Sequence, residues 1–292
     1  MTESHQPTVF SSTAAMETSW KKGELSSIDP FNLKEINFTI RQPEASEMFP
    51  PEEAQLYIDG CDYETSCDDL LLAIEIANDF GDLSQMTILD AMCGPGRLGR
   101  ELLSFGAGSV TFHDGAEIMI NHAKKQTAKK ELIDSQQINF IQSLIDQIPL
   151  PDNQFDLIAV HNSTHQLKSF EKLVTVTNEL TRLLKPGGTL LIADYQRNTS
   201  QNFLASLEER LFHTKPDIVL LLIPTFEAAF SITEFQQAFN LAPQLHNCSV
   251  INACLPEMTP EMLERVDQDP VKGHVLDFSP ISLRAIAQKE IV

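Results

Sequence analysis

A carboxylate followed by a cluster of glycines is the feature of this sequence whose residue types could do chemistry. Residues 87–99 form an apolar run that ends on Asp90 and then breaks at the glycines Gly94, Gly96 and Gly99. The pattern predicts a strand, a tight turn and a helix start, where absent Cβ atoms and unpaired helix N–H groups let a ligand approach the backbone. A nucleotide-like cofactor is the first expectation.

Two acidic residues refine the expected cofactor. Asp90 precedes the glycines, where a carboxylate would repel a pyrophosphate but could accept hydrogen bonds from an ammonium group. Asp114 ends a second short strand pattern over residues 109–113, and a carboxylate at such a position can hold the two hydroxyls of a ribose. The cofactor is therefore expected to carry both an amino group and a ribose.

Four segments, in this order and spacing, make the chain resemble the class I S-adenosylmethionine-dependent methyltransferases. They cover residues 88–96, 114–123, 148–156 and 183–194, and the resemblance is to the small-molecule enzymes akin to the ubiquinone and menaquinone biosynthesis methyltransferases. The resemblance implies S-adenosyl-L-methionine as the cofactor. It also implies an α/β fold: a Rossmann-like, doubly wound sheet of seven strands, mostly parallel with an antiparallel last strand, and an N-terminal helical cap.

The same resemblance assigns cofactor-binding residues. Gly94 and Gly96 are expected to bend around the methionine end of the cofactor, Asp114 to bind the ribose, and residues 143–145 to lie against adenine. The full expected set is Asp90, Cys93, Gly94, Gly96, Asp114, Gly115, Ser143, Leu144, Ile145 and His161.

Two positions depart from the family pattern. Leu144 stands where the family often has an aspartate that accepts a hydrogen bond from the adenine amino group, and Ala116 stands where it often has a serine. Adenine is then expected to be held by apolar packing and by backbone N–H groups near Leu144 and Ile145. Cys93, in the glycine turn, is interpreted as a small residue packed beside the cofactor rather than as a reactive thiol.

Composition indicates a soluble enzyme and disfavours several partners. The 292 residues suit one α/β domain with additions, and the formal net charge of −20 opposes binding to nucleic acid, whose phosphates need cationic neutralisation. The five cysteines show neither CxxC spacing nor a His–Cys cluster, so neither a disulfide framework nor a metal site is expected. No signal peptide or membrane-spanning run is recognised, and a cytoplasmic location is expected.

Three regions are predicted along the chain. Residues 1–45 are expected to be mobile, residues 46–84 to form the helical cap, and residues 85–292 to form the cofactor-binding domain, with a lid insertion at about 200–230. Strands are predicted near residues 86–91, 109–113, 138–142, 156–160, 188–194, 246–253 and 281–288, the last two as an antiparallel pair. Helices are predicted near residues 96–105, 117–129, 168–184 and 231–239.

Two histidines that follow the fourth predicted strand are the candidate catalytic residues. His161 is expected at the carboxyl end of that strand and His165 one turn further on. An imidazole there suits removal of a proton from a phenol, enol or carboxylic acid as it is methylated. The alternative is that either residue only lines the pocket, which is favoured for His165, and an acceptor that is already nucleophilic needs no base.

The acceptor pocket is expected to lie beside the cofactor, between the cap and the fifth strand. Its expected residues are Tyr57, Tyr63, His165, Asp194 and Tyr195. Residues 218–230 are more apolar than a solvated loop. Two interpretations are open: these residues pack onto the sheet or a dimer partner, or they form a lid over a hydrophobic acceptor. The first is favoured, because apolar helical stripes usually belong to a core.

Three functions remain open on the sequence alone. The leading one is a methyltransferase that acts on an oxygen, nitrogen or carbon atom of a small molecule, with oxygen slightly favoured and a monomer or homodimer expected. The alternative is a methyltransferase-like protein that has lost catalysis and serves as a partner or scaffold, because Leu144 and Ala116 remove two expected contacts. An NAD-dependent oxidoreductase is opposed by Asp90 before the glycine turn.

Overall fold

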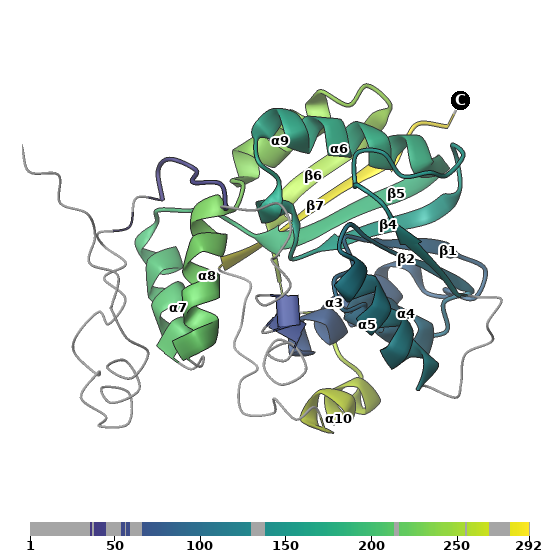
Figure 1. The fold of residues 1–292 in the computed structure, drawn as a ribbon, viewed down its shortest axis with the longest axis horizontal. Helices are drawn as coiled ribbons and strands as arrows, with labels where there is room; N and C mark the ends of the chain where they lie inside the picture. The colour runs from purple at the N-terminus through teal and green to yellow at the C-terminus, as the bar shows by residue number, and fades with distance from the viewer. Residues whose placement is uncertain are drawn as a thin grey trace, which may run out of the picture.

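A seven-stranded sheet forms the centre of the protein. The computed structural model describes residues 36, 38–44, 54–55, 57–58, 66–129, 138–212, 216–254, 256–268 and 281–291. The strand order is β3-β2-β1-β4-β5-β7-β6, and helices cover both faces of the sheet (Figure 1).

The strand directions settle the fold class. The strands are β1 (Thr87–Ala91), β2 (Ser109–Asp114), β3 (Ile138–Gln142), β4 (Phe155–His161), β5 (Leu184–Tyr195), β6 (Leu245–Asn252) and β7 (Ser282–Lys289). Strands β1 to β5 pair in parallel, whereas β7 runs antiparallel to both β5 and β6. The predicted Rossmann-like sheet with an antiparallel last strand is therefore confirmed.

The helices fall close to the predicted ranges where the sequence pattern is periodic. They are α3 (Ser66–Phe80), α4 (Arg97–Ser104), α5 (Glu117–Ala128), the 3-10 turn η2 (Thr164–Gln166), α6 (Phe170–Leu183), α7 (Gln201–Phe212), α8 (Pro216–Ala228), α9 (Ile232–Asn240) and α10 (Pro260–Gln268). Helix α6 begins where the side chain of Ser169 accepts a hydrogen bond from the backbone N–H of Lys172. Helix α9 begins with a capping box between Ser231 and Glu234.

One strand begins earlier than predicted. Strand β5 starts at Leu184 rather than near residue 188, because Leu184 already pairs with Phe155 before the register shifts to Thr189 opposite Leu157. The Lys-Pro-Gly-Gly segment at residues 185–188 thus lies within β5 at this irregularity, although α6 does end just before it, as predicted.

Two apolar clusters fix the two faces of the sheet. On one face, α6 and α9 pack onto β4 and β5 through side chains such as Leu180 and Phe235, which are fully buried. On the other face, α3 and α4 pack onto β1 and β2 through Leu72, Leu98 and Phe112. Because the cores lie on both sides, the ends of the central strands are held rigidly.

Residues 38–44 pack on the domain, which departs from the mobility predicted for residues 1–45. The guanidinium of Arg41 donates hydrogen bonds to the backbone carbonyls of His165, Leu167, Lys168 and Ala228. One cation that satisfies several carbonyls ties this segment to η2 and to the end of α8. Apart from Ile36, the preceding residues lie outside the described part of the chain.

Helices α7 and α8 lie side by side at one end of the sheet (Figure 1). Their inward side chains Phe203, Leu207 and Phe226 are fully buried, and Phe226 packs on Tyr195 at the end of β5, with ring centroids 4.7 Å apart. The described side chains of the apolar run thus pack against α7 and the end of β5, and a lid over an acceptor stays a prediction.

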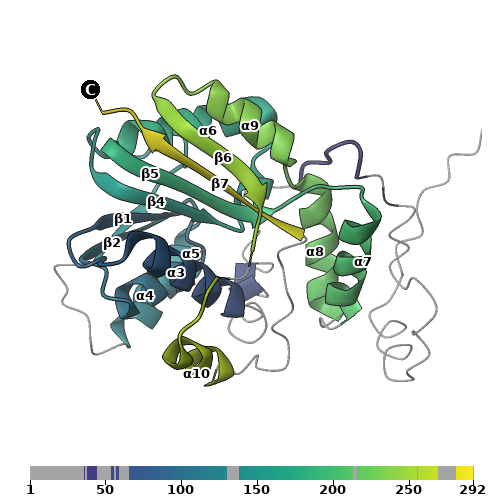
Figure 2. The same cartoon turned by 180° about the vertical axis from the view of Figure 1, so that it is seen from behind.

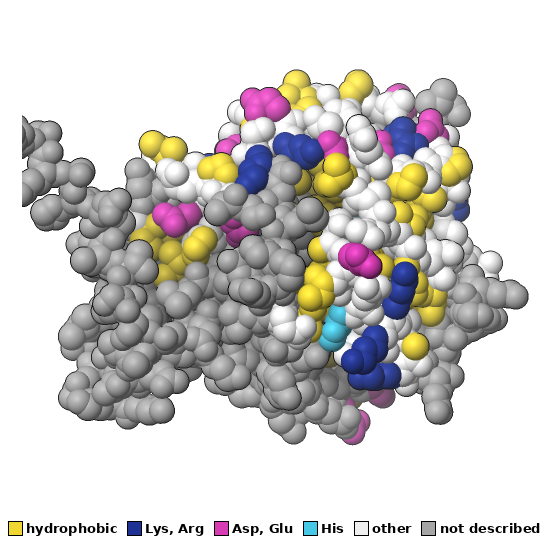
Figure 3. Space-filling view, in the orientation of Figure 1, with side chains coloured by type: hydrophobic (Ala, Val, Ile, Leu, Met, Phe, Trp, Pro, Cys, Tyr) yellow, Lys and Arg dark blue, Asp and Glu magenta, His cyan; other side chains and the backbone are white. Residues whose placement is uncertain are grey.

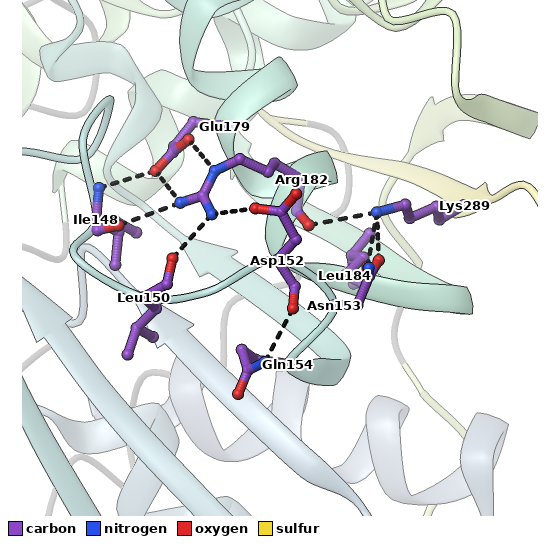
Figure 4. A network of polar contacts seen from close by, with 9 residues as sticks. All are labelled: Ile148, Leu150, Asp152, Asn153, Gln154, Glu179, Arg182, Leu184 and Lys289. Carbon is purple, nitrogen blue, oxygen red and sulfur yellow. Dashed lines mark hydrogen bonds and ion pairs between the residues drawn. The ribbon is translucent and has the colours of Figure 1, made fainter.

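A polar network connects the loop between β3 and β4 to the end of helix α6 (Figure 4). Arg182 of α6 donates to the carbonyls of Ile148 and Leu150 and pairs at 2.7 Å with both Glu179 and Asp152. The Ile-Pro-Leu-Pro-Asp-Asn segment that contributed to the resemblance is thus a structural clamp in this fold.

Candidate active site

A cavity opens at the carboxyl ends of β1, β2 and β4, where ligands bind in open α/β sheets. It encloses about 1200 Å³ of space, counting the mouth that opens to solvent. Its walls are Tyr57, Asp69, Asp90, Met92, Cys93, Gly94, Pro95, Arg97, Leu98, Asp114, Gly115, Ala116, Met119, Leu144, Ile145, Asp146, His161, Asn162, Ser163, Gln166, Leu167 and Lys172.

The glycines of the turn after β1 have different roles. Gly94 has φ +51°, and a Cβ on it would lie 4.0 Å from the Tyr57 ring, so its open side faces the cavity. Gly96 has φ +75°, but a Cβ on it would lie 2.7 Å from the Cβ of Ala123 and 3.0 Å from the Phe112 ring. Gly96 is therefore required by packing between α4 and α5, and it does not lie on the described cavity wall.

Asp90 is a buried residue that links the end of β1 to the start of α4. It is 1% exposed, and its Oδ2 accepts a hydrogen bond of 2.9 Å from the N–H of Gly99 in α4. Burial raises the pKa of Asp90 to about 7, with a further contribution from Asp69, against the smaller opposing effects of Gly99 and His161. The opposing effects of the Gly99 N–H, His161 and Arg100 on its pKa are thus outweighed by burial and by Asp69.

Asp114 joins the end of β2 to the glycine turn. Its Oδ2 accepts the N–H of Gly94 at 2.9 Å and its Oδ1 accepts the N–H of Ala116 at 2.8 Å. Burial raises its pKa, and these backbone N–H groups oppose the rise. The carboxylate is therefore fixed in orientation while it lines the cavity, and its role as a ribose ligand stays a prediction.

His113 contacts the backbone of the segments that form the cavity wall, near Met92 and Ser143. Its Nε2 lies 3.0 Å from both the carbonyl oxygen and the hydroxyl of Ser143, and its Nδ1 lies 3.5 Å from the backbone nitrogen of Met92. Burial lowers its pKa to about 4, so the ring is neutral at pH 7. Ser143 is thereby engaged with His113 behind the described wall, while Leu144 and Ile145 line the cavity.

His161 meets an unexpected partner at the end of β4. Its Nδ1 lies 2.8 Å from Oδ1 of Asp69, which comes from α3. Burial alone would lower the pKa of His161, but the charge and hydrogen bond of Asp69 outweigh burial and raise it. The carboxylate therefore favours a charged or strongly basic imidazole at the cavity wall.

The remaining predicted acceptor residues belong to a neighbouring buried cluster. Nδ1 of His165 lies 3.0 Å from Oδ1 of Asp194, whose Oδ2 accepts the N–H of Thr164 at 2.7 Å. Tyr195 packs on Phe226. Within the described part of the chain these three predicted residues lie behind the cavity wall, and Tyr63 falls outside that part. Of the predicted acceptor residues, the structure brings Tyr57 to the cavity.

Several wall residues could not be found from the sequence pattern. Asp69 lies 92 residues before its partner, and Lys172 pairs with Asp146 at 2.6 Å across the loop after β3. Met92 and Asn162 adopt the left-handed conformation, with φ 56° and 44°, just after β1 and β4. Asparagine tolerates this conformation, but methionine rarely adopts it, so the strain at Met92 marks a site that the fold holds in place.

Burial also bears on Cys93. The pKa of its thiol is raised well above the ordinary value by burial and by the carboxylates of Asp90 and Asp114. A thiol held in its neutral form is a poor nucleophile. Cys93 lines the cavity, and its packing beside a cofactor stays a prediction.

Part of the chain is similar to known methyltransferases. Residues 88–188 match the family described as a methyltransferase domain. A sterol 24-C-methyltransferase of Gibberella zeae is 33% identical over 113 residues, which cover 39% of this chain and 28% of that protein. A ubiquinone/menaquinone biosynthesis C-methyltransferase of Stutzerimonas stutzeri is 28% identical over 138 residues, which cover 44% of this chain and 49% of that protein. The matches thus span half or less of these relatives.

Solved structures share the fold over most of the chain. A plantazolicin methyltransferase, in complex with a triazolic desmethylPZN analog and SAH, has a TM-score of 0.61 at 20% identity and covers 82% of this chain and 91% of its own. A SAM-dependent methyltransferase from Aquifex aeolicus has a TM-score of 0.54 at 21% identity and covers 84% and 100%. The fold is that of a class I methyltransferase. The predicted resemblance to the class I S-adenosylmethionine-dependent enzymes, including the ubiquinone and menaquinone methyltransferases, is confirmed.

In the described part of the face shown in Figure 3, Lys and Arg side chains form separate groups among acidic and hydrophobic ones. No helix among the described residues is long and apolar enough to cross a membrane.

Proposed function

We propose that this protein is an S-adenosyl-L-methionine-dependent methyltransferase that acts on a small molecule. The observation that carries the proposal is the meeting of Asp114, Gly94 and Asp90 on one cavity wall in a methyltransferase fold. The carboxylate of Asp114 is fixed by two backbone N–H groups, so it is preorganised for the ribose hydroxyls.

The other walls fit the rest of the cofactor. The space beside Gly94 would be filled by a Cβ, and the nearby carboxyl groups of Asp90 and Asp69 can accept hydrogen bonds from an ammonium group or face a sulfonium. Leu144, which is 58% exposed, and Ile145 offer apolar surface to adenine. When bound, the cofactor supplies an electrophilic methyl group, and the protein residues bind, orient and exclude water around it.

We assign the proton chemistry to His161. It lies on the cavity wall at the carboxyl end of β4, and its basicity is raised by Asp69. Such a group can take a proton from a hydroxyl or an acidic C–H as that atom is methylated. The names of the two relatives favour carbon as the accepting atom, whereas a hydroxyl oxygen suits His161 equally well.

A catalytically inactive partner or scaffold protein is the second candidate. It is favoured by Leu144, whose side chain cannot accept a hydrogen bond from the adenine amino group. This candidate requires that the cofactor bind weakly or that no methyl group be transferred.

An activity screen with radiolabelled cofactor tests the proposal. Protein is incubated with methyl-labelled S-adenosylmethionine and either a protein-free metabolite extract or a lipid extract, and labelled products are separated and identified. We expect one labelled product with wild-type protein, a loss of roughly 10²–10⁴-fold with His161→Ala, and retained cofactor affinity in that variant. Cofactor binding without transfer to any extract would favour the inactive scaffold instead.

A further inference from the structure

The partner of His161 comes from outside the sheet. Asp69 lies in the first turn of α3, in the N-terminal part of the chain and outside residues 88–188, which match the methyltransferase family. The side chains of His161 and Asp69 are only 9% and 20% exposed, and both line the cavity. A hydrogen bond of 2.8 Å in such a shielded place is much stronger than one at the surface.

This contact determines which nitrogen of the ring is available. An ionised carboxylate only accepts hydrogen bonds, so the nitrogen that faces Asp69, Nδ1 of His161, carries the proton. Nε2 receives no hydrogen bond from the residues that the structure describes. In the neutral ring the lone pair is therefore on Nε2, the nitrogen that a base would use.

Helix α3 is held firmly enough to keep Asp69 in place. One side of the helix packs on the sheet through fully buried side chains. The other side packs against α10 and the segment that leads into it. Helix α10 lies beside α3 in both views (Figures 1 and 2). The first set is Leu72, Ala73 and Ile76, and the second is Leu70, Leu71 and Ile74 with Met258 and Met262.

Two polar contacts add to this packing. Glu75, in the middle of α3, pairs at 2.8 Å with Arg284 of β7. The side-chain amide of Asn78 donates a hydrogen bond of 2.7 Å to the carbonyl of Glu257. The position of Asp69 is thus fixed from the sheet, from β7 and from the segment before α10, which is the support that a catalytic geometry needs.

Other charges around the ring are weaker than Asp69. Asp68 of α3 raises the pKa of His161 further, and Arg284 of β7 lowers it. Asp90, on the neighbouring strand β1, interacts with both Asp69 and His161. Asp69 makes the largest of the favourable contributions, and it alone of these groups is hydrogen-bonded to the ring.

We propose that Asp69 is the positioning residue of His161, so that helix α3 completes the catalytic centre. This inference rests on the proposed function, in which His161 acts as the base. A proton leaves the acceptor for Nε2, and the electron pair that it leaves behind forms the bond to the methyl carbon of the sulfonium. The electrons of the broken carbon–sulfur bond stay on sulfur, which becomes the neutral thioether.

Histidine NMR tests the inference without any acceptor. The protein is labelled with ¹⁵N-histidine, and the His161 signal is identified by its loss in His161→Gln. In wild type we expect protonation at Nδ1 and a pKa above the ordinary 6.5. In Asp69→Asn burial remains while the attraction is lost, so the pKa of His161 should fall below 6.5. Asp79→Asn, at an exposed position of the same helix, is the matched control and should leave the titration unchanged.

Steady-state kinetics with the acceptor, known from the labelled product of the screen, give the second readout. Asp69→Asn should lower kcat at least about tenfold at pH 7, with a smaller change in KM. The pH at which the rate begins to rise should also be lower in this variant. Asp69→Glu should restore part of the rate. An unchanged His161 titration in Asp69→Asn, or a change in KM alone, would overturn the positioning role. Absence of S-adenosylhomocysteine binding by wild type would instead refute the proposed function.

Discussion

Replacement of Asp90 by asparagine should change how stability depends on pH. Because the pKa of Asp90 is raised from 3.8 to about 7 by burial and by Asp69, the folded state holds a proton that the unfolded state has released. The stabilisation is fully present below pH 3.8 and is lost as pH rises through about 7. Asparagine keeps an oxygen for the Gly99 N–H but has no proton to lose.

The size of the effect follows from the pKa. Between pH 5 and pH 8 the wild type should lose roughly 3 kcal/mol of unfolding free energy through Asp90, and Asp90→Asn should lose none of it. The amide NH₂ costs about 1–3 kcal/mol if it finds no acceptor, but that cost is the same at each pH. Urea denaturation of both proteins from pH 5 to pH 8, without cofactor, measures the difference.

Asp156 supplies a control of opposite sign. Burial alone would raise its pKa, but Lys185 and the N–H and hydroxyl of Thr87 outweigh burial and lower it. Its contribution to stability is present above the unfolded pKa and is lost only as pH falls through the lower folded value. Asp156→Asn should therefore be destabilised by a constant amount between pH 5 and pH 8. A constant offset for Asp90→Asn as well would refute the reasoning.

Two further predictions concern the turn and the clamp. Gly96→Ala should lower the free energy of unfolding by about 2–5 kcal/mol, since its Cβ would lie 2.7 Å from the Cβ of Ala123 in a left-handed conformation. Gly94→Ala should lower it by about 1–2 kcal/mol, but this variant should also bind S-adenosylhomocysteine more weakly. Equal losses of stability in urea denaturation would contradict this division. Arg182→Met should lower the free energy of unfolding by about 1–3 kcal/mol in the same assay, because three contacts with the loop after β3 and one with Glu179 of α6 disappear, while cofactor affinity is kept. Unchanged stability would show that the network in Figure 4 contributes little.

The sheet and the glycine turn could be predicted because their signals are local. Alternating apolar strands and periodic helices appear within short windows, and Asp114 follows its strand directly. The start of β5 could not be predicted, because the pairing of Leu184 with Phe155 precedes a proline and two glycines that usually end an element.

The site was only partly predictable, because its contacts join distant segments. Nothing near His161 in the sequence points to Asp69, and nothing near Arg41 points to the carbonyls of His165 and Ala228. Gly96 shows a second limit. A glycine needed for packing and one needed for a ligand give the same sequence signal, and only the neighbouring side chains distinguish them.

Calorimetric titration with S-adenosylhomocysteine tests the central claim most directly. Wild type should bind one molecule per chain, while NAD should not bind. Asp114→Ala should bind at least about tenfold more weakly, since loss of a charge-assisted hydrogen bond costs about 1.5–3 kcal/mol. Asp156→Asn, which alters a carboxylate away from the cavity wall, should keep wild-type affinity. Absence of binding to folded wild type, or unchanged affinity in a folded Asp114→Ala, would contradict the account.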